Sequence, residues 1–378
     1  AYFLFHLLWY GSHQTFLRSS VELYPSYIQI INKDFNDDPS FENIIINSNT
    51  LIKELSKNSK IQILTQRFEN FVLLSSDSKS IGSMIVGIEP QKEELISKLK
   101  KSLIFGEYLN NNDTNQIYLG EQLALNLKVK VGDKISYVGT GIDYSFSADN
   151  LYVKGIFSTG LYEFDESSSF VNKSYFDEAF VSENLSTHII ILPKDISQAQ
   201  SLSDEINNNL PYDLLSQSWQ ESMKSLVRAM EIDSIFGYIT MAIFFLVIFF
   251  VILIYTLLSI FARTKEIGIL RAIGTKQIDV FNMLFFESCV LALIGVLIGG
   301  IIGASLSYYF YINPFDFGST YDEQFKQYGL INSTIPTAFD KMVILRDMVI
   351  MFILTIVSTL YPIFKVNKLN PTEAINHV

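Results

Sequence analysis

The sequence lacks most signatures of an enzyme. It contains no G-x-x-x-x-G-K-[ST] motif, so the chain has no P-loop for ATP, and its lone Gly139-Thr140-Gly141 lacks the third glycine of a dinucleotide site. The four histidines are scattered without partners at metal-ligand spacing, and no serine sits in a nucleophile elbow. We therefore expect no catalytic residues, no metal site and no bound cofactor in this chain.

Cysteine and charge are also scarce. The only cysteine, Cys289, excludes a disulfide within the chain, so a large domain must be held together by an ordinary hydrophobic core. Charged residues make up 18% of the sequence and hydrophobic residues 49%, which argues against a disordered chain and against a nucleic-acid partner. That hydrophobicity is concentrated in a few long runs.

Three runs have the character of membrane spans. Residues 234–262 contain no Asp, Glu, Lys or Arg, and residues 280–312 contain only Glu287, whereas roughly 20 apolar residues suffice for a helix to cross a bilayer. The run 348–364 is shorter, but flanking Arg and Lys side chains can extend it to the interface. The opening AYFLFHLLWY is too short to cross alone and has no signal-peptide pattern. We interpret it as the end of a first span whose beginning is absent.

Charge assigns the two sides of the membrane. From residue 234 onward there are nine basic and nine acidic residues, so the whole net charge of −11 belongs to residues 1–233. Basic residues exceed acidic ones in 263–279 and after the last span, which places both segments in the cytoplasm by the positive-inside rule. The predicted fold is a membrane protein with four transmembrane α-helices and a large extracytoplasmic α+β domain between the first and second spans. The predicted segments are the end of the first span at 1–17, the extracytoplasmic domain at 18–233, the second span at 234–262, a cytoplasmic helix and loop at 263–279, the third span at 280–312, a short outer loop at 313–341, the fourth span at 342–366 and a cytoplasmic tail at 367–378.

The long segment 20–233 alternates between strand-like and helix-like runs. Residues 61–66, 70–75, 83–88 and 168–173 are typical of separate strands, because they are β-branched or aromatic runs bounded by turn residues. Residues 134–157 predict two strands joined by a polar turn. The run 39–57 and several others predict helices that begin near Pro, Asp or Ser.

The segment between the second and third spans predicts a short amphipathic helix. At 100° per residue, Ile267, Ile269, Leu270 and Ile273 fall on one arc of about 160°. Gly274 is suited to the left-handed position that ends such a helix. The helix could lie in the headgroup layer of the membrane, or it could dock into a groove of a cytoplasmic partner.

Two motifs resemble a known family. RTKEIGILRAIG (263–274) after the second span and KLNPTEAI (368–375) after the last span resemble the signatures of FtsX-like ABC transporter permeases. Within that family, VGIEPQKEE (86–94), the L-G-x-x-L-A run in 117–135 and VKGIFSTGLYEFD (153–165) resemble elements of the lipoprotein-releasing, Lol-type permeases. The family has four spans and a large external domain after the first span.

The resemblance implies a coupling role for the short helix. It would sit on a cytoplasmic ATPase dimer that binds the ATP, with its apolar residues in a groove and its charged residues at the rim. This implication favours docking over a position in the headgroup layer. The residues expected to couple to the ATPase are Arg263, Lys265, Glu266, Ile267, Leu270, Arg271, Ile273 and Gly274.

The third span carries a stripe of small residues. Gly295, Gly299 and Gly303 recur every fourth position, which lets two helices approach closely in lipid. We predict that this stripe packs against a helix of the same subunit, with a contact between subunits as the alternative. Glu287 has a functional interpretation as an acid within the membrane. We favour a plainer one, in which Glu287 reaches headgroup water or a basic residue of the loop.

The second span is rich in phenylalanine. In the resembling family, the first and second spans of two permease subunits enclose a cavity, and an apolar cavity suits acyl chains better than a hydrophilic solute. The same side chains could simply face lipid. The residues expected to line the substrate cavity are Phe5, Leu8, Phe244, Phe245, Ile248 and Phe249.

The resemblance as a whole predicts a function. The chain would be the permease subunit of an ABC transporter, paired with a second permease subunit as a homo- or heterodimer, in the bacterial inner membrane with its large domain in the periplasm. It would extract a lipoprotein from the membrane lipids and release it to a periplasmic carrier. The alternatives are an FtsX-type signalling permease that transports nothing, and a MacB-like efflux permease that works with an adaptor and an outer-membrane channel.

Overall fold

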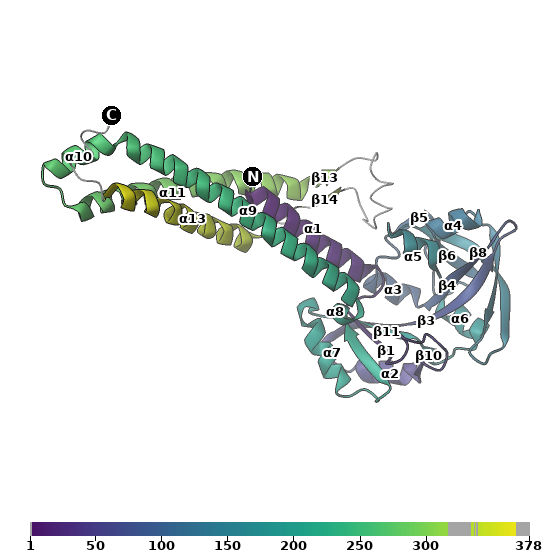
Figure 1. Ribbon diagram of the computed structural model, residues 1–378. Coiled ribbons are helices and arrows are strands. Elements are labelled where there is room, and N and C mark those ends of the chain that lie inside the picture. Colours follow the sequence, from purple (N-terminus) through teal and green to yellow (C-terminus); the bar gives the residue numbers. More distant parts are fainter. Residues whose placement is uncertain (1, 317–333, 336, 338, 368–378) are drawn as a thin grey trace. The chain divides into compact units, whose positions relative to one another are not determined.

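The computed structural model describes residues 2–316, 334–335, 337 and 339–367, which form two compact units. The helical unit comprises the described residues of 1–15, 229–316 and 334–367, and the sheet unit comprises residues 16–228. Figure 1 labels the elements of both units. The closing motif 368–375 and most of the predicted outer loop lie outside the described residues.

The sheet unit has α+β architecture, as predicted for this part of the chain. Its strands are β1 (Ile28–Asn32), β2 (Ile45–Ile46), β3 (Ile61–Ser75), β4 (Ser80–Ile88), β5 (Leu103–Gly106), β6 (Gln116–Gly120), β7 (Lys134–Thr140), β8 (Phe146–Phe157), β9 (Ser168–Asn172), β10 (Leu185–Ser186), β11 (His188–Pro193) and β12 (Leu214–Ser218). Its helices are α2 (Ser48–Leu55), α3 (Pro90–Ile96), α4 (Glu121–Leu127), α5 (Tyr162–Ser167), α6 (Lys173–Phe180), η1 (Ile196–Gln198), α7 (Ala199–Asn207) and α8 (Trp219–Ser222).

Six strands close into a barrel. The pairing runs β3, β4, β9, β6, β8 and β7, and β7 pairs with β3 again. Side chains alternate along each strand, so one face of every strand contributes to a shared interior. Phe68, Leu74, Ile117 and Tyr137 belong to that buried interior. The hairpin of β7 and β8 confirms the two strands and turn predicted for 134–157.

Strand β3 belongs to two layers at once. Its second half lies in the barrel, and its first half continues a sheet with β11, β1 and β12. Helices α2 and α7 cover that sheet through a second apolar cluster. The prediction of separate strands at 61–66 and 70–75 was wrong, because Arg67, Phe68 and Glu69 continue the strand without a break.

The predicted helix at 39–57 was also too long. Only Ser48–Leu55 is helical, and Ile45 and Ile46 pair with β10 instead. Asn47 adopts a left-handed backbone with φ of 57°, which interrupts any helix through this position.

The helical unit contains four long helices and one short one. They are α1 (Tyr2–Leu23, whose last residues belong to the sheet unit), α9 (Lys224–Ala262, whose first residues do too), α10 (Thr264–Ala272), α11 (Gln277–Ile312) and α13 (Lys341–Asn367). A short antiparallel pair, β13 (Phe315–Asp316) with β14 (Thr334–Ile335), follows α11. Figure 1 shows α10 at the turn between α9 and α11.

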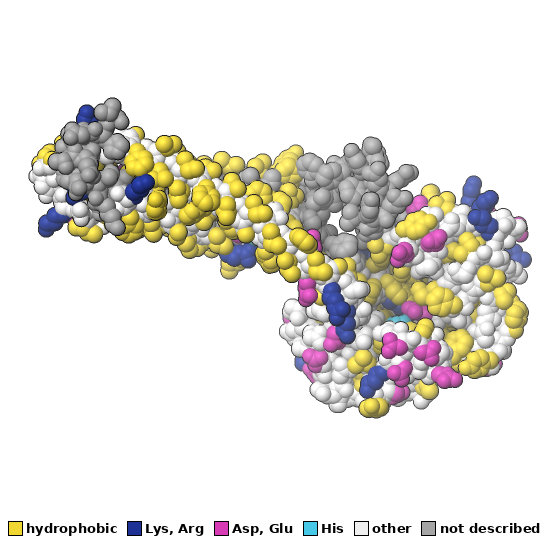
Figure 2. Space-filling model, viewed as in Figure 1, with side chains coloured by type: hydrophobic (Ala, Val, Ile, Leu, Met, Phe, Trp, Pro, Cys, Tyr) yellow, Lys and Arg dark blue, Asp and Glu magenta, His cyan; other side chains and the backbone are white. Residues whose placement is uncertain are grey.

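Three of these helices suit a membrane. Among the described residues, Lys224–Ala262, Gln277–Ile312 and Lys341–Lys365 are long and apolar enough to cross one. Hydrophobic side chains cover the visible face of the long helices in Figure 2, whereas acidic side chains gather over the sheet unit. Helix α1 is not among the three, so the first of the four expected spans stays a prediction.

Candidate functional site

The short helix α10 ends where the sequence indicated. Gly274 has φ of +107°, a conformation that favours glycine. Its N–H donates to the Arg271 carbonyl at 3.1 Å, and the Thr275 N–H donates to the Leu270 carbonyl at 3.2 Å. Together these bonds form a Schellman motif, which confirms the helix-ending position predicted for Gly274.

One face of α10 is fixed to the ends of the long helices. Ile267 is 4% exposed and packs with Ile260 of α9, Val280 and Leu284 of α11, and Ile363 of α13. The expectation that Ile267 enters a groove of a partner is therefore corrected, because its side chain is already enclosed by its own chain. Ile267 lies at one end of the predicted arc, and this end of the arc faces inward.

The opposite edge of α10 is exposed. Leu270 is 38% exposed, Ile269 48% and Ile273 79%, and Lys265 and Glu266 are exposed beside them. We call these five residues the outer edge of α10. Two large apolar side chains on a nine-residue helix, with Ile273 at its C-cap, leave a surface that water solvates poorly. The outer edge is thus the part of the predicted site that a partner can reach.

Arg263 points away from the outer edge. Its guanidinium donates to the Glu287 carboxylate on α11 at 2.7 Å, and both side chains are about half exposed. This pair confirms that Glu287 reaches a basic residue of the loop. Arg263, which was expected at the rim of a partner's groove, thus binds a residue of its own chain. Arg271, also expected at that rim, is half-buried.

The residues expected to line a substrate cavity do not share one surface. Phe5 and Phe244 bring α1 and α9 together with ring centroids 5.4 Å apart. Phe245 and Ile248 instead pack with Met241, Trp9 and two methionines of α13. Leu8 is half-buried, and Phe249 stacks edge-on against Phe250 of its own helix. The cavity role of all six residues stays a prediction.

The face of α11 that packs against α13 lies one position away from the predicted stripe of small residues. A Cβ at Gly300 would lie 2.8 Å from Met348 on α13, whereas nothing lies within 4 Å of a Cβ at Gly295 or Gly299. Gly303 is half-buried. The predicted packing of Gly295 and Gly299 against a helix of the same chain was therefore wrong. A shift of one residue turns the contact face by 100°, which four-residue spacing alone does not fix.

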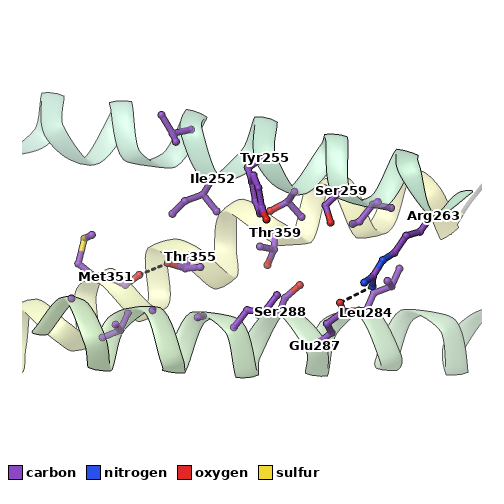
Figure 3. A pocket seen from close by; sticks show the side chains of 18 residues that line it. Ile252, Tyr255, Ser259, Arg263, Leu284, Glu287, Ser288, Met351, Thr355 and Thr359 are labelled. Carbon is purple, nitrogen blue, oxygen red and sulfur yellow. Dashed lines mark hydrogen bonds and ion pairs between the residues drawn. The ribbon is translucent and has the colours of Figure 1, made fainter. Parts of the chain in front are cut away.

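Open space beside those glycines forms a groove. It has a volume of about 460 Å³ and lies between α9, α11 and α13. Figure 3 shows Arg263 and Glu287 meeting across one end of it, with Tyr255 and Ser259 reaching in from α9 and Thr355 and Thr359 from α13. Gly295, Gly299 and Ala292 also line the groove. The sequence analysis did not anticipate this feature.

A second missed feature is a buried pair near the start of α13. His6 of α1 and Asp347 are 4% and 0% exposed, and His6 Nδ1 lies 2.5 Å from Asp347 Oδ2. Arg346 approaches both, with Nη2 at 3.4 Å from His6 Nε2. Ionisable residues in apolar segments are rare and usually pair with one another, so Asp347 carried a signal that could have been followed.

Residues of the sequence motifs in the sheet unit stabilise its fold. Glu93 binds buried Arg67 through two hydrogen bonds of 2.6 and 3.0 Å. The Asp165 carboxylate accepts from the Thr159 N–H and hydroxyl, and burial raises the pKa of Asp165. A Cβ at Gly120 would lie 2.1 Å from the Asp165 carbonyl oxygen, so only glycine fits there. These positions define the domain's shape, and they carry no direct information on its substrate.

Comparison with known proteins relates the membrane part of the chain to a family. Residues 238–371 match the family model described as FtsX-like permease C-terminal. These residues include helix α10 and the three candidate spans from Tyr238 onward. This part of the chain therefore resembles the membrane region of FtsX-like permeases.

Individual relatives are similar over most of their length. An uncharacterized membrane protein of Buchnera aphidicola subsp. Schizaphis graminum is 26% identical over 322 residues, which covers 81% of this chain and 75% of the relative. The lipoprotein-releasing system transmembrane protein LolC of the same organism is 26% identical over 367 residues, 91% of this chain and 86% of that protein. Among solved structures, the periplasmic region of MacB from Actinobacillus actinomycetemcomitans matches with a TM-score of 0.39 and 19% identity, covering 53% of this chain and 92% of that one.

Proposed function

We propose that this chain is the permease subunit of an ABC transporter that extracts lipoproteins from the bacterial inner membrane. The observation that carries the proposal is the outer edge of α10, an exposed apolar surface on a short helix between two candidate spans. A cytoplasmic ATPase dimer would bind there, with Leu270 and Ile273 in its groove and Lys265 and Glu266 at the rim. Buried apolar contacts supply most of such binding energy, and rim charges orient the partner.

The inner face of α10 suits the transmission of force. Ile267 contacts residues from the ends of α9, α11 and α13 that lie nearest α10, in one buried cluster. Close-packed cores deform little, so a displacement of α10 moves these helix ends together. The ATPase would thus move three spans by moving one short helix.

A lipid-anchored substrate makes this motor necessary. Withdrawing acyl chains from a bilayer costs about 0.8 kcal/mol per CH₂ group, so several chains cannot leave without an energy source. Phe5 and Phe244 would line the apolar route, which a second permease subunit completes. The sheet unit would stand in the periplasm, where a carrier receives the substrate. The similarity to LolC over most of the chain supports this substrate class.

The test is ATP-driven release of a lipoprotein from proteoliposomes that hold the permease and its ATPase. The variant Leu270→Asp should lower release at least about tenfold, since it places a charge in the expected groove. Ile46→Asp is the matched control, because Ile46 is an exposed isoleucine of the sheet unit.

The outcomes separate the alternatives. Normal release by Leu270→Asp would contradict the coupling role. A wild-type complex that hydrolyses ATP but releases no lipoprotein would contradict the substrate and point to signalling, or to efflux if an added adaptor restores transport.

A further inference from the structure

The groove between α9, α11 and α13 is left empty by the chain itself. Its floor is formed by Ala292, Gly295 and Gly299, and no atom lies within 4 Å of a Cβ at either glycine. Apolar side chains such as Val251 and Ile252 form part of its α9 wall, beside Tyr255 and Thr256. The volume of about 460 Å³ falls within the range of roughly 300–1,000 Å³ found for small-molecule sites.

The groove has a polar end and an apolar end. The polar end holds the ion pair of Arg263 with Glu287, together with the hydroxyls of Ser259 and Ser288. In the described chain neither serine hydroxyl has a hydrogen-bond partner, so both can bond to a ligand. Toward Gly299 and Met351 the lining becomes apolar. This gradient parallels the molecule of a phospholipid, from headgroup to acyl chain.

The Thr hydroxyls of α13 are already used. Thr355 donates to the Met351 carbonyl and Thr359 to the Ile356 carbonyl, each at 2.8 Å. Because these bonds run along α13 itself, the two Thr hydroxyls contribute little free polarity to a ligand. In the middle of the groove the Tyr255 hydroxyl of α9 remains as a polar group, and charged groups line only the Arg263 end.

We propose that the groove binds one phospholipid whose headgroup carries both a phosphate and a primary ammonium group. Arg263 would donate to the phosphate and Glu287 would accept from the ammonium, so a headgroup with both charges matches a pair with both charges. An acyl chain would then lie over Gly295 and Gly299. A purely anionic headgroup would satisfy Arg263 but would face the Glu287 carboxylate.

Such a lipid would fill the space between α9 and the packed pair of α11 and α13. Near the Arg263 end, Ile260 joins α9 to α11 and α13 in a buried cluster, and Met241 is buried with methionines of α13 farther along. The groove lies between these two points, so the bound chain would set the spacing there. This site does not depend on which substrate the permease moves.

The test uses the purified full-length permease in nanodiscs with photoactivatable lipids. Phosphatidylethanolamine and phosphatidylglycerol, each with the photoreactive group in an acyl chain, are compared at equal concentration. Phosphatidylethanolamine should label residues 251–263 and 284–299 at least about tenfold more, as expected for one charge-assisted hydrogen bond. Equal labelling of these segments by the two lipids would overturn the proposal.

Two variants separate the headgroup from the acyl chain. Glu287→Gln should remove the preference for phosphatidylethanolamine while both lipids still label the groove. Gly299→Phe should abolish labelling by both, because the new ring enters the open space, whereas Ile301→Phe on the exposed face of the same helix should not. An undiminished preference for phosphatidylethanolamine in Glu287→Gln, or undiminished labelling in Gly299→Phe, would contradict the proposed lipid site.

Discussion

The two units use the same apolar residues in opposite ways. In the sheet unit, Phe68, Phe170 and Phe176 are fully buried, whereas in the helical unit Phe236 and Phe250 are 65% and 50% exposed. Water penalises exposed apolar surface, but lipid does not. The sheet unit is therefore held by burial from water. The helical unit must be held by close packing, polar pairs and the membrane around it.

Charge follows the same division. Residues 1–233 carry the whole net charge of −11, and residues 234–378 are balanced. Two polar pairs of the helical unit link its elements: His6 with Asp347 joins α1 to α13, and Arg263 with Glu287 joins the turn before α10 to α11. Each unit also contains a buried pair of ionisable residues, Arg67 with Glu93 in the sheet unit and His6 with Asp347 in the helical unit. Substitutions at these pairs test how far the two environments differ.

The largest effect is expected at the buried ion pair of the sheet unit. Arg67 is 1% exposed, and Glu93→Ala leaves its buried charge without a partner. The free energy of unfolding should therefore fall by about 3–5 kcal/mol. Chemical denaturation followed by Trp219 fluorescence measures this loss of stability. The experiment uses a Trp9→Phe background, because Trp9 is the other tryptophan of the chain. Lys60→Gln, which breaks an exposed pair with Glu205, should have almost no effect. Similar losses of stability in both variants would contradict the stabilising role of the buried pair Arg67 with Glu93.

The corresponding change in the helical unit should be smaller. Asp347→Asn keeps the shape but replaces the carboxyl group that faces His6, at an expected cost of about 1.5–3 kcal/mol. Thermal unfolding in detergent micelles provides the measurement. In a double-mutant cycle with His6→Ala the two effects should not add, since both remove one interaction. Additive effects would show that the two residues act separately.

Two glycines on one helix should respond differently. Gly300→Leu forces a side chain into Met348 and should destabilise the helical unit by about 1–3 kcal/mol. Gly295→Leu enters open space and should be nearly neutral. Thermal unfolding of both variants in the same detergent compares them. The reverse order would mean that the stripe packs as the four-residue spacing first suggested.

The smallest effect concerns pH and the sheet unit. Burial lowers the pKa of His188, which lies against Phe35 and Glu69. The unfolded chain then binds more protons just below pH 6.5, so acidification from pH 7 to 5 lowers the stability contributed by this group. His188→Gln should therefore lose less stability over that interval than wild type, measured by Trp219 fluorescence. An identical or steeper loss would contradict the lowered pKa.

Local chemistry made some of the structure predictable. Long uncharged runs predict the helices α9, α11 and α13, because few other structures accommodate them. Gly274 marks the end of α10, since glycine takes its left-handed backbone without strain. Alternating apolar residues flanking a polar turn likewise indicate the hairpin of β7 and β8.

Contacts between residues far apart in the sequence decided the features that could not be predicted. Helical spacing places Ile267, Leu270 and Ile273 on one arc but does not say which of them the chain encloses. Strand β3 continues through Arg67 because Glu93, 26 residues later, neutralises its charge inside the domain. The pair of His6 with Asp347 joins residues 341 positions apart. These outcomes depend on tertiary partners, which a local pattern does not specify.

The central claim is that the outer edge of α10 binds the ATPase. The affinity of the detergent-solubilised permease for its purified ATPase tests it directly, with Leu270→Asp and Ile273→Asp compared with Ile46→Asp. The account predicts binding weakened by about tenfold or more in the first two variants, as for central residues of an interface, and unchanged binding in the third. Wild-type affinity in Leu270→Asp and Ile273→Asp would contradict it.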